Sequence, residues 1–90
     1  MTRLFARHAV NDYSTWRAAY DDFDSERKEM GVRAHSVFQD ADNPNMVTIM
    51  HDFDSVESAQ SFSGSARLKE VMKEAGVAGP PEIWLATAAD

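Results

Sequence analysis

The chain has 90 residues, with 15 acidic against nine basic side chains and a formal net charge of -6. This acidic balance disfavours nucleic acid and anionic membrane surfaces as partners, because both repel a protein of the same sign. The sequence has no cysteine, which excludes disulfides and thiolate zinc sites and fits the cytoplasm. We expect one domain over residues 1–90, without a membrane span or a signal peptide.

The first third of the chain predicts a strand followed by a helix. Residues 3–10 alternate between two faces, which is the pattern of a strand. Asp12 can cap the helix that follows, and Gly31 predicts its left-handed end. Between them, large residues recur at steps of three and four and form an unusually aromatic stripe. This stripe consists of Tyr13, Trp16, Ala19, Tyr20 and Phe23 and continues to Arg27 and Met30.

Residues 32–53 predict a β-hairpin with its turn at residues 40–45, Asp-Ala-Asp-Asn-Pro-Asn. We place Gln39 opposite Met46 and assume no bulge. The apolar residues of both strands then gather on one face, an agreement that a one-residue slip would destroy.

This register fixes the faces of the hairpin side chains. It directs Phe38 and His51 toward the helices and His35 toward the opposite face. It also sets Arg33 opposite Asp52, so we expect a cross-strand ion pair between them.

The last third predicts helix, turn and strand. Residues 54–57, Asp-Ser-Val-Glu, form a capping-box pattern in which Asp54 is the cap. The run from 63 to 65, Ser-Gly-Ser, interrupts the helical spacing, so two short helices or one kinked helix fit equally well. Gly79-Pro80-Pro81 predicts a rigid turn, and residues 82–87 predict the last strand.

The element order strand, helix, strand, strand, helix, strand predicts a ferredoxin-like βαββαβ sandwich. Its antiparallel four-stranded sheet has the order four, one, three, two, with two helices on one face. The other face is too apolar for plain surface, so we expect a homodimer in which two sheets pack face to face. The residues expected there are Arg3 or Phe5, Arg7, Val37, Met46, Thr48 and Met50, joined by Trp84 if Ile83 and Leu85 turn inward.

Several short motifs together resemble a known group of proteins. They are His8 with Asp12-Tyr13 and Trp16, Gly31-Val32-Arg33, Asp42-Asn43-Pro44-Asn45 before Val47, Phe53-Asp54, Ala75-Gly76-Val77, and Pro80-Pro81 before Ile83. This pattern resembles the dimeric α/β-barrel superfamily, which includes antibiotic-biosynthesis monooxygenase-like proteins, small aromatic-polyketide cyclases and muconolactone-isomerase-like enzymes. The resemblance implies a dimer and a pocket between each sheet and its own helices. It supplies no matched catalytic residues.

The histidines are the natural acid or base candidates, because their ordinary pKa lies near neutrality. We assign catalytic roles to His8 and His51, which face the helices, and to Tyr20, which can donate a hydrogen bond. Each histidine also has a structural explanation, such as a bond from His8 to a backbone carbonyl or to Asp12. About four residues, or ~13 Å, separate His8 from His51 along the sheet, so we expect no shared metal ion.

The expected ligand-binding wall is aromatic. Its members are Trp16, Phe23, Phe38 and Phe62. Such rings either stack on a planar ligand or simply pack as core. Arg27 on the same stripe could neutralise an anionic group, or it could lay its stem over apolar surface.

These residues predict a small enzyme that needs no cofactor and acts on an apolar, aromatic or polyketide-like small molecule. His8 would move a proton and Tyr20 would orient an oxygen. Cyclisation, isomerisation and oxygenation remain open, because each could use such a pocket. The alternative is a non-catalytic dimeric ligand-binding or interaction protein whose histidines are structural. The sequence lacks G-x-S-x-G, H-E-x-x-H and a phosphate-binding glycine loop.

Overall fold

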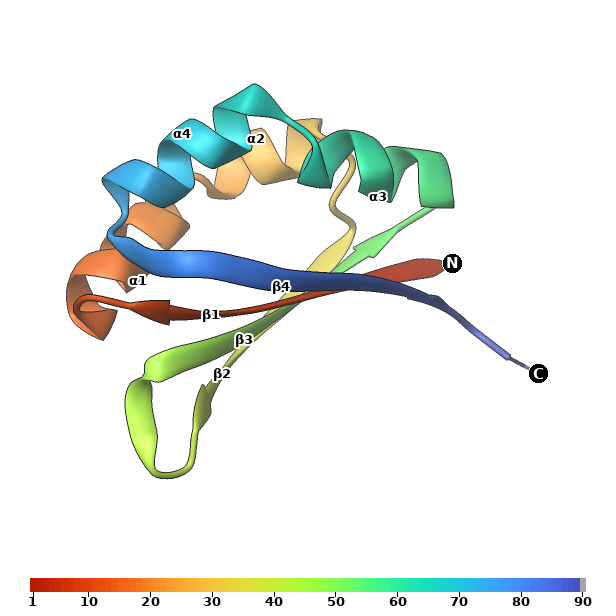
Figure 1. Ribbon diagram of the computed structural model, residues 1–90. Coiled ribbons are helices and arrows are strands. Elements are labelled where there is room, and N and C mark those ends of the chain that lie inside the picture. The colour runs from red at the N-terminus through yellow and green to blue at the C-terminus, as the bar shows by residue number, and fades with distance from the viewer. Residues whose placement is uncertain (90) are drawn as a thin grey trace.

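The computed structural model describes residues 1–89 and contains a four-stranded antiparallel sheet in the order β2-β3-β1-β4. Its helices cover one face of this sheet, as Figure 1 shows. The elements are β1 (Thr2–Val10), α1 (Tyr13–Asp22), α2 (Asp24–Glu29), β2 (Ala34–Asp40), β3 (Asn43–Phe53), α3 (Val56–Ser63), α4 (Ala66–Glu74) and β4 (Val77–Thr87). The predicted ferredoxin-like sandwich is confirmed.

The first predicted helix divides into α1 and α2 at Phe23. Asp12 caps α1 as predicted, because its carboxylate accepts a hydrogen bond from the Thr15 backbone N–H at 3.0 Å. At Phe23 the backbone N–H reaches two carbonyls, those of Ala19 and Tyr20, which tightens the chain and ends α1. Gly31 follows α2 with a φ of 102°, the left-handed conformation expected for it.

The second predicted helix is two helices rather than one kinked helix. Gly64 ends α3, and Ser65 begins α4 by accepting a bond from the Leu68 N–H. The cap of α3 is Ser55 rather than the predicted Asp54, whose carboxylate instead pairs with Arg33 at 2.8 Å. Serine and aspartate are about equally good N-caps. Because the Asp54 carboxylate is paired with Arg33, the Ser55 hydroxyl caps the helix.

The hairpin register differs from the predicted one by a bulge. His35 lies opposite His51 and Gln39 opposite Val47, but the next pair is Asp40 with Asn43. Residues 44–46 of β3 therefore have no partners on β2, and the β2 side chains exchange faces relative to our prediction.

Three predictions that depended on that register are wrong. His35 and Val37 face the helices, not the open face of the sheet, because they pair with the inward-facing odd residues of β3. Phe38 faces the opposite way and is 57% exposed. The side chain of Arg33 does not pair with Asp52, which instead receives two hydrogen bonds from Arg3 on β1.

β4 starts earlier than predicted, and the expected turn at residues 79–81 is a bulge within it. The pairing with β1 shifts between Arg7 and Ala9, so the bulge lies opposite His8. Beyond it, Ile83 lies opposite Ala6 and turns toward the helices, while Trp84 stacks on Phe5 at 5.3 Å between ring centroids on the open face.

Two groups of buried apolar residues fill the space between sheet and helices. One contains Leu4, Phe23, Val32, Phe53, Ala59 and Phe62, and the other contains Val10, Trp16, Tyr20, Val47, Ile49 and Ala75. Residues of both groups line a common cavity, which therefore lies between them. In the described part of the chain, no helix is long and apolar enough to span a membrane.

Candidate functional site

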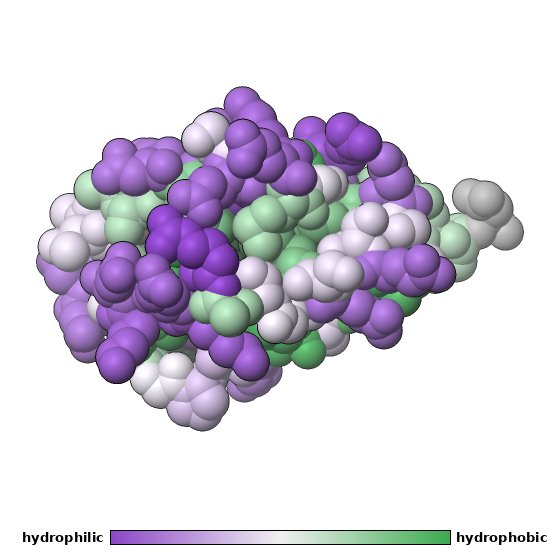
Figure 2. Space-filling view, turned by 90° about the horizontal axis from the view of Figure 1, so that it is seen from above, coloured by the Kyte–Doolittle hydropathy of each residue, from purple (hydrophilic) through white to green (hydrophobic). Residues whose placement is uncertain are grey.

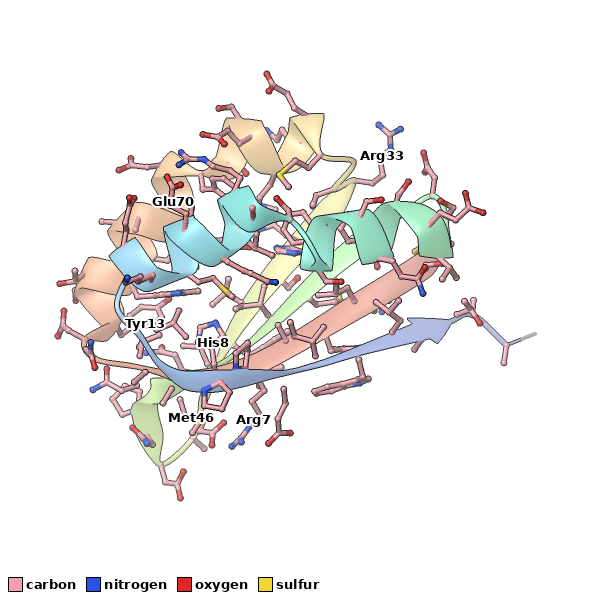
Figure 3. The ribbon with its side chains drawn as sticks, turned by 45° about the horizontal axis from the view of Figure 1, so that its top comes forward. Arg7, His8, Tyr13, Arg33, Met46 and Glu70 are labelled. Carbon is pink, nitrogen blue, oxygen red and sulfur yellow. The ribbon has the colours of Figure 1, made fainter. Side chains whose placement is uncertain are left out.

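A cavity of about 60 Å³ lies between the sheet and the helices. Most of its wall is apolar, and the polar side chains that reach it are His8, Tyr20, Arg27, His51 and Ser63. Figure 3 shows His8 directed into the space between sheet and helices, whereas the neighbouring Arg7 points away from it. Because side chains alternate along β1, the His8 side chain faces the cavity.

Among the polar groups of the wall, His51 has the pKa that lies furthest from its ordinary value. It projects from β3, is 5% exposed, and its Nε2 lies 3.2 Å from the Tyr20 hydroxyl. Within residues 1–89 its Nδ1 has no hydrogen-bond partner. Burial, reinforced by the positive charge of Arg27, lowers the pKa of His51 to about 3, so this imidazole is neutral at pH 7.

The Tyr20 hydroxyl joins two imidazoles. Besides His51, it contacts His35 Nδ1 at 2.9 Å. Burial raises the pKa of Tyr20 to about 12, which keeps the phenol protonated. The other nitrogen of His35, Nε2, lies 3.6 Å from an oxygen of Asp24 at the surface. A series of polar groups therefore runs from the cavity through Tyr20 and His35 to Asp24.

Arg27 is buried although it is charged. It is 2% exposed, and its guanidinium carbon lies 3.7 Å from the centroid of the Tyr20 ring. Nη1 donates to the Tyr20 backbone carbonyl, and Nη2 donates to Asp24 at 3.1 Å. Its Nε has no partner in the described part of the chain. The cavity wall thus carries a positive charge.

His8 has fewer polar contacts. Its ring meets Trp16 edge-on at 5.8 Å between centroids, and its Nδ1 lies 3.3 Å from the Ala9 carbonyl. Burial lowers the pKa of His8. Asp12, considered as its partner, instead binds Thr15. Bulges often adjoin functional sites, and the β4 bulge leaves His8 unpaired on that side.

The structure brings most of the predicted residues together around the cavity. They are His8, Trp16, Tyr20, Phe23, His51 and Phe62. Phe38, predicted as a ligand contact, lies on the other face of the sheet. Sequence reasoning missed His35 because the register turned it outward. The available signal was Pro44, since proline within a strand often marks a bulge.

None of the residues 1–89 form a group of three or more His, Asp or Glu side chains suited to a metal ion. The wall offers aromatic rings, one cation and two imidazoles instead. Such a set can hold a planar molecule and move a proton.

Solved structures of other proteins share this fold. An antibiotic biosynthesis monooxygenase matches with a TM-score of 0.78 and 13% identity over 100% of both chains. A candidate antibiotic biosynthesis monooxygenase from Bordetella bronchiseptica matches with a TM-score of 0.83 and 17% identity over 98% of this chain and 96% of its own. SnoaB, a cofactor-independent oxygenase from Streptomyces nogalater, matches with a TM-score of 0.79 and 12% identity, over 99% and 93% respectively.

These likenesses define the class of fold. The chain has the ferredoxin-like α+β architecture of the antibiotic biosynthesis monooxygenase structures, as the sequence motifs led us to expect. No protein-family model matches the sequence, and no curated protein matches it. At such identities the shared fold leaves substrate and reaction to be argued from the cavity itself.

Proposed function

We propose that this protein is a small enzyme that needs no cofactor and acts on an aromatic or polyketide-like molecule in the cavity. One observation carries the proposal: the Tyr20 hydroxyl bridges His51, at the wall of an apolar cavity, and His35, near the surface. The fold shared with a cofactor-independent oxygenase supports it. The cytoplasmic location expected from the sequence belongs to the same proposal.

The bridge can carry a proton out of the cavity. At the start, His51 donates Nε2–H to the Tyr20 oxygen, and Tyr20 donates its hydroxyl hydrogen to His35 Nδ1. When His51 Nδ1 takes a proton from a ligand, its Nε2 proton passes to Tyr20 and the Tyr20 proton passes to His35. His35 then carries the positive charge, opposite the Asp24 carboxylate. His51 is thus left neutral, as its burial requires.

This arrangement favours His51 over His8 as the base. Sequence reasoning assigned the proton transfer to His8. Among residues 1–89, however, the polar contact of His8 is the Ala9 carbonyl, and no series of hydrogen-bonded side chains leads away from it. Removal of a proton can begin a cyclisation, an isomerisation or an oxygenation without cofactor. The reaction type therefore stays open among these three.

The cavity must widen to admit a ring. Its volume of about 60 Å³ is below the roughly 150 Å³ of an apolar cavity that binds benzene. We expect α4 to be the part of the wall that moves, because it has no buried residues and contributes Leu68 and Met72 to the lining. Methionine adapts readily to irregular shapes. Figure 2, seen from the helix side, shows hydrophobic surface among the hydrophilic side chains of that face.

A screen of planar phenols and enols would test the proposal, with binding followed by melting temperature and turnover followed by chromatography. We expect His51→Gln and His35→Gln to lower the turnover of a compound that the wild type consumes at least about tenfold. Glutamine can form a hydrogen bond, but it cannot take up a proton and pass it on. His8→Gln is the matched control and should retain most of the turnover. If no compound binds, the cavity is not a ligand site. Binding without turnover would favour the second candidate, a non-catalytic ligand-binding protein.

We also propose that the open face of the sheet joins two copies of the chain. Phe5 and Trp84 stack there, and Phe38 and Trp84 are 57% and 45% exposed. Large exposed aromatics on one face of a sheet, beside the Arg3–Asp52 ion pair, are typical of an interface. Light scattering at micromolar concentration should report a dimer that Trp84→Glu dissociates. A wild-type monomer would refute this.

A further inference from the structure

Arg27 carries a buried positive charge that its neighbours only partly neutralise. Charged side chains are almost never fully buried without a partner. The carboxylate that Arg27 reaches is Asp24, which is partly exposed and shared with Lys28 at 3.0 Å and His35 at 3.6 Å. No buried carboxylate pairs with Arg27 in the described part of the chain. The cavity wall therefore retains a net attraction for negative charge.

A structural role explains only part of the Arg27 side chain. Nη1 closes the end of α1 by donating to the Tyr20 carbonyl, and Nη2 holds Asp24. The guanidinium plane packs on the Tyr20 ring. None of these contacts uses Nε, which is fully enclosed and has no partner within residues 1–89. Buried N–H groups in native proteins almost always have an acceptor, so an unused donor here calls for one.

His51, which lines the same cavity, has a second atom without a partner within residues 1–89. Its Nδ1 is also enclosed and unpartnered among the described residues. Tyr20 links the two groups, because Arg27 lies over its ring while His51 meets its hydroxyl. The rest of the wall is largely aromatic or aliphatic. Two unpaired polar nitrogens at a mainly apolar cavity are the pattern of a site that fixes one polar group of a ligand.

We infer that the cavity binds a planar ligand carrying an anionic oxygen, of a carboxylate or a phenolate, which accepts hydrogen bonds from Arg27 Nε–H and His51 Nδ1–H. The inference deepens the proposed function and rests on it, in that the cavity must be a ligand site. An anionic oxygen suits both groups, since Arg27 supplies charge and the apolar surroundings strengthen the attraction.

The two hydrogen bonds require one arrangement of protons. If His51 carries its proton on Nδ1, its Nε2 accepts from the Tyr20 hydroxyl, and the Tyr20 oxygen accepts from His35 Nδ1–H. This is the state left when a proton has moved outward along the series. An oxygen that loses its proton to His51 therefore stays beside Arg27, which stabilises the anion formed.

The test compares two ligands of the same shape and different charge. Benzoate and benzamide are titrated into the intact protein at neutral pH by calorimetry, with toluene as an apolar reference. We expect benzoate to bind at least about tenfold more tightly than benzamide, which corresponds to about 1.4 kcal/mol. Equal affinities for the two would overturn the inference.

Arg27→Met removes the charge while keeping a side chain of similar length, and should abolish the preference for benzoate. Arg17→Met is the matched control. Arg17 also lies near the Tyr20 ring, at 5.4 Å, but pairs with Asp21 outside the cavity. This variant should keep the preference. A preference that survives in folded Arg27→Met would place the benzoate elsewhere and refute the role of Arg27.

If Arg27→Met does not fold, a measurement on the wild-type protein can test the inference instead. Nitrogen NMR of the His51 ring distinguishes its two neutral forms, and benzoate should shift it to the Nδ1–H form, whereas toluene should not. An unchanged ring with benzoate bound would refute the inference. If toluene and benzamide bind as well as benzoate, the cavity is a ligand site and only the anion preference fails. If none of the three binds, the proposed function fails as well.

Discussion

The buried neutral state of His51 predicts a specific loss of stability in mild acid. Burial holds its pKa at about 3 in the folded protein, whereas an imidazole in the unfolded chain has a pKa near ~6.5. Below about pH 6.5 His51 binds a proton in the unfolded state but stays neutral in the folded state, so the free energy of unfolding falls as the pH falls. Between about pH 7 and about pH 5 the loss from this one group is about 2 kcal/mol.

Urea denaturation at the two pH values measures this loss, and His51→Phe is the reference. Phenylalanine matches the ring contacts of His51 with Phe62 and Phe53 and does not titrate. His8, whose pKa burial also lowers, contributes in the same direction but is present in both proteins. The wild type should therefore lose about 2 kcal/mol more than His51→Phe. Equal losses in the two proteins would show that His51 is not held neutral.

Three further predictions concern the fold. Phe53→Ala should cost about 3–5 kcal/mol, because this ring is fully buried, whereas Phe38→Ala should cost less than about 1 kcal/mol; comparable costs in urea denaturation would mean that the hairpin register is wrong. Tyr20→Phe should cost about 1–3 kcal/mol by the same assay, because it leaves two imidazole nitrogens without their hydroxyl partner; no loss would mean that the bridge is not formed. Gly31→Ala should lower the unfolding free energy by about 1–2 kcal/mol through its left-handed backbone alone, since a methyl group has room there; an unchanged melting temperature would contradict that conformation.

The architecture followed from local patterns. Strand alternation, helical spacing and Asp12 as a cap define the elements, and handedness limits their topology to the observed sheet order. The hairpin register could not be predicted from local patterns, because its bulge is accompanied by a contact with a distant part of the chain. Asn45, within the bulge, accepts a hydrogen bond from the Tyr13 N–H at 2.9 Å and so ties the hairpin to the start of α1. A contact between residues so far apart leaves no periodic trace in the sequence.

The candidate site was predictable to the same extent. Alternation alone places His8 and His51 on the helix face, and helical spacing places Tyr20 above them. The contact between Tyr20 and His35 depends on the bulge in the hairpin, so it was not predicted from the sequence. Helical spacing also placed Arg27 on the inner stripe, but it did not predict the nearly complete burial of the side chain, because a charged group near a helix end ordinarily reaches solvent. In the structure the guanidinium packs on the Tyr20 ring instead.

The bulge at residues 79–81 also limits how this chain can aggregate. β4 is an edge strand, and an exposed edge offers free N–H and C=O groups to the strand of another molecule. Pro80 and Pro81 have no N–H to offer, and the bulge bends the edge, so a ladder of added strands is interrupted at that point. An added strand could therefore pair only with the shorter segments of β4 on either side of the two prolines. Fibril growth along this edge is thus disfavoured by the same bulge that lies opposite His8.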